Sequence, residues 1–132
     1  MTPLPQIGET ITTQRALELC KHFSFDHLVK RLETDSDRFK SWEFDGCSMI
    51  PDKIASKLIG VPTLTEICLR HDLGYAYGEP KNKEERLKVD FTFGIELLEG
   101  GASASIAQMM FEGVRIGGGE FGMSFSWAFA RK

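Results

Sequence analysis

One aspartate inside an apolar run restricts the fold of this chain more than any other feature. Asp90 is the only ionisable residue between Val89 and Ile95. A carboxylate buried among valine and phenylalanine side chains is costly unless a hydrogen-bonding or charged partner faces it. A histidine ring N–H is a natural partner, because the carboxylate fixes its tautomer and supports the imidazolium. The alternative is an edge carboxylate exposed to water, and both readings stay open at this point.

His71 is positioned to be that partner if its segment forms a helix. Thr63 after Pro62 is the expected N-cap, with Glu66 three residues on as in a capping box. Gly78-Glu79-Pro80 is expected to end the helix. If the segments bearing His71 and Asp90 are antiparallel helices joined near this turn, the two side chains can face each other.

The length of 132 residues fits one domain, residues 1–132. Apolar residues at helical spacing predict a helix over residues 12–33, which Thr12 or Thr13 could cap. The polar piece Thr34–Asp37 predicts a turn.

The second half of the chain is less clear in its periodicity. Lys81–Lys88 is charged and helix-prone, whereas residues 89–97 also alternate like a strand. A buried helix fits better there, since no breaker separates the two stretches. Ser103–Glu112 predicts a helix, and the alternating tail at residues 123–129 allows a short β-hairpin near the C-terminus. We therefore predict a mainly α fold, a small helical domain with two central antiparallel helices.

Charge and hydropathy exclude several classes of protein. The net charge of −3 argues against nucleic-acid binding and against retention on anionic lipid by general electrostatics. No stretch of 18 or more apolar residues exists, so no bilayer-spanning helix is expected. The first eleven residues are not typical of a signal peptide, which predicts a cytoplasmic protein or export by a non-classical route. Three cysteines are too few for a disulfide scaffold, and one bridge or three free thiols both fit.

Two short motifs contain residues suited to chemistry. On a helix, His71 and Tyr75 share a face, while Asp72 points about 100° away. This arrangement suits a base beside a metal ligand, although a surface His-Asp pair is the commoner meaning of an isolated dipeptide. In Asp45-Gly46-Cys47-Ser48, a glycine beside an acid lets backbone carbonyls turn toward a hard cation such as calcium. Taken alone, such a tetrapeptide is more often only a turn.

Together with Asp90, these motifs resemble the phospholipase A2 superfamily, most closely its prokaryotic and fungal secreted-type branch. The likeness lies in the loop from Asp45 to Ser48 with Pro51-Asp52, in the helix motif Cys68–Tyr75, and in the basic stretch Arg86–Asp90. It covers about 46 of the 132 residues, within a motif-bearing core at residues 45–98. The helix motif is its most specific part.

The resemblance implies calcium-dependent hydrolysis of the sn-2 acyl ester of glycerophospholipids. His71 would be the general base that activates water. Asp90 would orient His71, and Tyr75 would hydrogen-bond to that aspartate. The implied partner is a phospholipid substrate or a membrane surface contacted peripherally.

The resemblance also implies a calcium ion and a disulfide. Asp72 and Asp45 would bind the metal with their carboxylates, and a backbone carbonyl near Gly46 would complete part of the shell. The ion and a loop N–H would stabilise the oxyanion. Cys47 and Cys68 lie where the family has a bridge between loop and helix.

Four other interpretations remain. The chain could be a catalytically inactive phospholipase A2-like binding or structural module, or a thiol hydrolase using Cys47 or Cys68 with His71. A zinc site at Cys20, His22 and His27 is disfavoured, since histidines five residues apart on a helix do not share a face. The aromatic tail with its basic end suits either core packing or a lipid surface.

Overall fold

The structure is a computed structural model that describes residues 3–47, 60–117 and 129–130. This part of the chain is mainly helical, with a small two-stranded antiparallel sheet. In chain order the elements are β1 (Thr10–Ile11), α1 (Thr13–His22), α2 (Asp26–Thr34), the 3₁₀ turn η1 (Ser36–Arg38), β2 (Trp42–Glu43), α4 (Leu64–Ala76), α5 (Lys83–Glu99) and α6 (Ala104–Gly117). None of the helices in these ranges is both long and apolar enough to cross a membrane.

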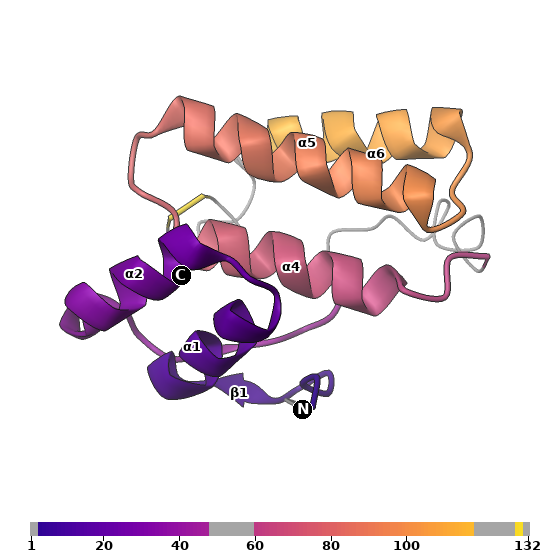
Figure 1. Cartoon of the computed structure of the whole chain (residues 1–132). Helices are drawn as coiled ribbons and strands as arrows, with labels where there is room; N and C mark the ends of the chain where they lie inside the picture. Colours follow the sequence, from indigo (N-terminus) through magenta and orange to yellow (C-terminus); the bar gives the residue numbers. More distant parts are fainter. Residues whose placement is uncertain (1–2, 48–59, 118–128, 131–132) are drawn as a thin grey trace.

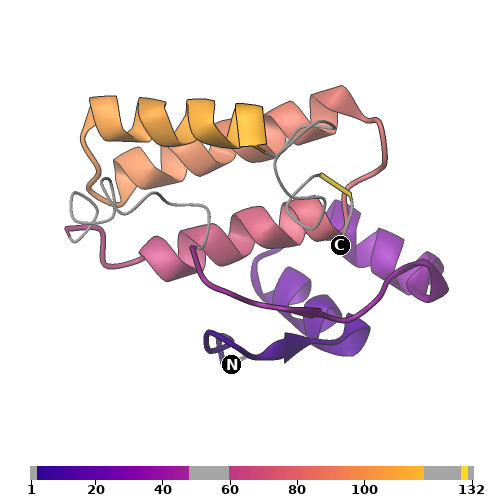
Figure 2. The ribbon, with the colours of Figure 1, turned by 180° about the vertical axis from the view of Figure 1, so that it is seen from behind.

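Helix α4 lies in the middle of the molecule. Helices α5 and α6 lie along one side of it, and α1, α2 and the sheet lie along the other (Figures 1 and 2). Successive helices α4, α5 and α6 run in alternate directions (Figure 1). The predicted pair of central antiparallel helices is therefore α4 and α5.

Two clusters of buried side chains hold these layers together, and α4 contributes to both. Leu69 and Leu73 pack toward the N-terminal helices, whereas Ile67 and Cys68 pack toward α5 and α6. Because α4 is covered on most sides, its sequence is apolar around most of its circumference, as expected for a buried helix.

A glycine lets α4 and α5 approach closely. A Cβ atom placed on Gly74 would lie 2.8 Å from Cγ1 of Val89, which is closer than two carbons can pack. Gly74 follows His71 on α4, and Val89 precedes Asp90 on α5. The close approach therefore occurs at the level of the predicted site.

The helix predicted over residues 12–33 is two helices. Thr12 caps α1 by accepting a hydrogen bond from the N–H of Arg15, as expected. The break follows from a Schellman motif: Ser24 has φ +60°, and the N–H of Phe25 donates to the carbonyl of Cys20. A serine rather than a glycine takes the left-handed position, so the usual sequence signal for a helix end is missing.

The remaining sequence predictions are partly confirmed and partly wrong, and one lies outside the described residues. Thr63 is the N-cap of α4, but within the described residues its side chain makes no capping hydrogen bond, so the predicted capping box is not formed. Residues 89–97 belong to α5, so the strand alternative is wrong. Ser103–Glu112 lies almost wholly within α6, as predicted. Most of the alternating tail, at residues 123–128, lies outside the described residues, as does any hairpin there.

Candidate active site

His71 and Asp90 meet between α4 and α5. His71 Nε2 lies 2.9 Å from Asp90 Oδ1, and the Tyr75 hydroxyl donates to the same oxygen at 2.6 Å. Tyr75 is one helical turn beyond His71, so α4 presents both side chains to the aspartate. Asp90 is fully buried and His71 is 6% exposed. The aspartate in the apolar run therefore has its partners inside the protein, and the exposed-edge reading is wrong.

The ionisation of Asp90 determines which imidazole nitrogen is available. Burial raises the pKa of the Asp90 carboxyl, but the hydrogen bond and charge of His71, with hydrogen bonds from Tyr75 and Arg115, outweigh burial and lower the pKa. An ionised carboxylate only accepts hydrogen bonds, so the neutral imidazole must carry its proton on Nε2. Nδ1 is then left as an acceptor, as a general base requires.

Aromatic rings hold the imidazole in place. The His71 ring centroid lies 4.3 Å from that of Tyr75 and 4.7 Å from that of Phe93. Burial, and then the neighbouring Asp90, raise the pKa of Tyr75, so its hydroxyl stays protonated and donates. Phe129 packs edge-on against Tyr75, with centroids 5.3 Å apart.

Two arginines that the sequence analysis did not assign to the site contact it. Arg115 Nη1 from α6 donates to Asp90 Oδ2 at 2.8 Å. Arg86, one turn before Asp90 on α5, has its Nε 3.7 Å from the same oxygen and donates to the Tyr75 hydroxyl at 3.2 Å. The spacing of four residues between Arg86 and Asp90 is a readable helix pair, whereas nothing local to Arg115 indicates its contact.

The predicted calcium loop is joined to α4 by a disulfide between Cys47 and Cys68. Cys68 lies one turn before Asp72, so the bridge brings the loop to the part of α4 that carries this carboxylate. Gly46 has φ +71°, a conformation that favours glycine and turns successive peptide groups in different directions. Asp45 is exposed and Asp72 is partly exposed.

The carboxylates of Asp45 and Asp72 and the backbone carbonyl near Gly46 are hard oxygen ligands of the kind calcium prefers. Across residues 3–47, 60–117 and 129–130, no three histidine, cysteine, aspartate or glutamate side chains cluster to hold a metal. A site here would therefore depend on Asp72, Asp45 and backbone carbonyls. Residues 48–59, which include the predicted Pro51-Asp52, lie outside the described residues.

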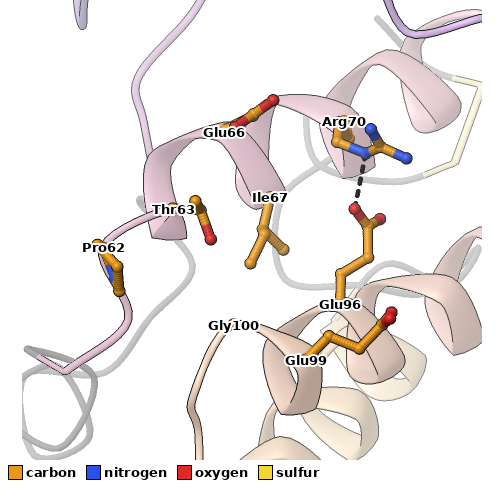
Figure 3. A pocket seen from close by; sticks show the side chains of 8 residues that line it. All are labelled: Pro62, Thr63, Glu66, Ile67, Arg70, Glu96, Glu99 and Gly100. Carbon is orange, nitrogen blue, oxygen red and sulfur yellow. Dashed lines mark ion pairs between the residues drawn. The ribbon is translucent and has the colours of Figure 1, made fainter.

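A separate open groove of about 450 Å³ lies where the start of α4 meets the end of α5 (Figure 3). Arg70 Nε and Glu96 Oε2 form an ion pair across it at 2.7 Å. Burial raises the pKa of Glu96 against the lowering effect of Arg70. None of the predicted catalytic or metal-binding residues lines this groove, so it is distinct from the His71 site.

Two of the rival interpretations are not compatible with the structure. Cys47 and Cys68 are bonded to each other, so neither is a free thiol nucleophile. Cys20 is buried, and burial raises its pKa to about 12. His22 and His27 are exposed on different helices, which does not fit the zinc site.

Comparison with protein-family models, with curated proteins and with solved structures finds no match for this chain. A functional assignment therefore has to come from its residues.

Proposed function

We propose that this protein is a calcium-dependent phospholipase A2, which hydrolyses the sn-2 acyl ester of glycerophospholipids. The observation that carries the proposal is the buried arrangement of His71, Asp90 and Tyr75, in which one imidazole nitrogen is held by a carboxylate and the other is left as an acceptor. The motif resemblance in residues 45–90 supports the choice of substrate class.

In this mechanism His71 Nδ1 takes a proton from a water molecule as the water attacks the ester carbonyl. Asp90 accepts a hydrogen bond from the Nε2–H group throughout, which keeps the ring oriented and stabilises the imidazolium that forms. The same proton on Nδ1 is then delivered to the leaving alcohol. Tyr75 donates to Asp90 and limits rotation of the carboxylate.

Asp72, Asp45 and a carbonyl near Gly46 are the proposed calcium ligands. A bound calcium ion supplies positive charge for the substrate phosphate and the developing oxyanion. The Cys47–Cys68 disulfide supports this assignment, because it joins the loop to the helix that carries Asp72.

The proposed partner is the surface of a phospholipid aggregate. Four large apolar side chains on α5 recur at helical spacing, although each is 39–58% exposed. These are Leu87, Phe91, Ile95 and Leu98. Phe91→Ser is expected to weaken cosedimentation with phosphatidylcholine–phosphatidylglycerol vesicles, whereas Ile116→Ser, at a 79% exposed position on α6, is the matched control. Equal vesicle binding by both variants would show that these apolar side chains of α5 do not form the lipid-binding surface.

The enzyme is tested by fatty-acid release from vesicles whose lipids carry different acyl chains at sn-1 and sn-2. We expect release of the sn-2 acid with calcium and none with excess chelator. His71→Ala should lower the rate about 10²- to 10⁴-fold, and Asp72→Asn should abolish the response to calcium. His22→Ala, at an exposed histidine on α1, is the control.

Three results would count against this proposal. Full activity in His71→Ala would exclude the general-base mechanism. Normal calcium-free hydrolysis by Asp72→Asn would exclude the metal role. Absence of release in every condition, with vesicle binding retained, would favour the inactive binding module.

A further inference from the structure

The second oxygen of Asp90 has its own partner from a distant part of the chain. Oδ1 accepts from both His71 and Tyr75, whereas Oδ2 accepts from Arg115 Nη1 at 2.8 Å. A carboxylate held at only one oxygen can rotate about its terminal bond, which is a soft torsion. The charge-assisted bond to Arg115 restricts this rotation at Oδ2, where the longer ion pair of Arg86 at 3.7 Å also contributes.

The position of Arg115 is in turn fixed by Arg86. The last carbonyls of a helix lack partners within the helix, and here the guanidinium of Arg86 donates to the carbonyls of Val114 and Arg115 near the end of α6. The contact to Val114 is 3.0 Å. Arg86 thus holds the end of α6 against α5, at the place from which the Arg115 side chain reaches Asp90.

We propose that Arg115 is a positioning residue for the His71–Asp90 pair. It holds the Asp90 carboxylate in the rotation that presents Oδ1 to His71 Nε2, and so keeps the imidazole aimed for proton transfer. Among the described residues, the side chain of Arg115 contacts the Asp90 carboxylate, so Arg115 acts through Asp90 and not on the imidazole directly. The kinetic consequence rests on the proposed phospholipase function, whereas the effect on the imidazole does not.

The kinetic test compares Arg115→Gln, Arg115→Lys and Arg38→Gln in sn-2 fatty-acid release. Arg38 is the matched control, because its side chain is 34% exposed and ion-paired with Glu79, against 31% exposed for Arg115. For Arg115→Gln we expect kcat to fall about tenfold to a hundredfold, since small misplacements of catalytic groups cost this much. KM for lipid should stay within about twofold, and Arg115→Lys should recover most of kcat.

A second readout follows the imidazole itself. In protein labelled with ¹⁵N-histidine, the wild-type His71 signal should report a proton fixed on Nε2 and protected from exchange. In Arg115→Gln that protection should be lost, whereas in Arg38→Gln it should remain. Should Arg115→Gln fail to fold, Arg115→Met, which keeps much of the length of the side chain without its charge, takes its place, with the same loss expected.

An unchanged His71 signal in the folded variant overturns the proposal, as does wild-type kcat in Arg115→Gln. A parallel fall in kcat and rise in KM that lysine does not rescue also overturns it, because that pattern is structural damage. If the wild-type protein releases no fatty acid, the phospholipase proposal fails, and the His71 signal still decides the role of Arg115.

Discussion

Replacing Asp90 with asparagine tests the central contact of the site. The side chain keeps its shape but loses its charge, and one of the two buried oxygens that accept from His71, Tyr75 and Arg115 becomes an NH2 donor facing another donor. Removing one partner of a buried ion pair costs about 3–5 kcal/mol. Because the Arg115 side chain is 31% exposed and can recover water, we expect a smaller loss of about 2–3 kcal/mol in the free energy of unfolding.

Glu96→Gln is the control for this measurement. Glu96 lies on the same helix and forms an ion pair with Arg70 at 2.7 Å. Its pKa is raised, chiefly by burial, whereas that of Asp90 is lowered. Folding therefore favours the neutral form of Glu96 and the ionised form of Asp90. In urea unfolding, Glu96→Gln should change stability by less than about 0.5 kcal/mol, and equal losses in both variants would refute the reasoning.

The pH dependence of the Asp90→Asn difference follows from the same shift. Because the folded pKa of Asp90 lies below the unfolded value of about 3.9, the unfolded chain binds more protons between the two values. The contribution of Asp90 is thus fully present above about pH 4 and is lost as the pH falls through the folded pKa. The stability advantage of the wild type over Asp90→Asn should shrink below about pH 4. An advantage that grew with acid would contradict an ionised Asp90.

The same variant should be nearly inactive in fatty-acid release. An amide in place of the carboxylate no longer selects the tautomer of His71 that carries its proton on Nε2. In the Asp–His pair of a serine protease, the same Asp-to-Asn change lowers kcat about 10⁴-fold. A loss smaller than tenfold, in a variant that is folded at the assay temperature, would show that His71 does not depend on Asp90 for its tautomer.

Two further predictions concern the scaffold around the site. Gly74→Ala should lower stability by about 1–3 kcal/mol, because its Cβ would meet Val89 at 2.8 Å. Gly113→Ala on α6, where no atom of the described residues lies within 4 Å of the new Cβ, should be neutral or stabilising by up to about 1 kcal/mol. Thermal unfolding of both variants decides whether close packing causes the difference. Replacing Cys47 and Cys68 together by serine opens a bridge with a sequence separation of 21 and should cost about 3 kcal/mol in denaturant unfolding, whereas an unchanged midpoint would mean that the bridge adds nothing to the fold.

The long helices could be predicted because their signals are local. The charged start and apolar continuation of α5 lie in one uninterrupted stretch, and Thr12 caps α1 as its type suggests. The break at Ser24 could not be predicted in the same way, since apolar spacing continues across it into α2. Both helices pack against the same buried cluster. The apolar spacing therefore indicates which side chains are buried, and it does not indicate where the chain changes direction.

The candidate site likewise contains some contacts that could be predicted from the sequence and one that could not. The need of Asp90 for a partner is visible in the sequence, because an acid in an apolar run is costly anywhere in a core. The spacing of His71 and Tyr75 on one helix face is also visible. Arg115 is not, because its contact depends on how the end of α6 packs against α5, and this packing in turn depends on the carbonyl contacts of Arg86.

A buried network of this kind is an argument for function that does not depend on sequence relatives. Apolar side chains of similar volume would usually stabilise a helix interface as well or better, because taking charges out of water costs more than their attraction returns. Yet this chain places a carboxylate, an imidazole and a phenol together at the α4–α5 interface and brings two guanidinium groups to it. Ionisable groups with shifted pKa values cluster at functional sites as well as in structural ion-pair networks. In the proposed mechanism the imidazole of His71 is the member of this network that takes the proton from water, so we interpret the other members as the means of fixing the position of its second nitrogen.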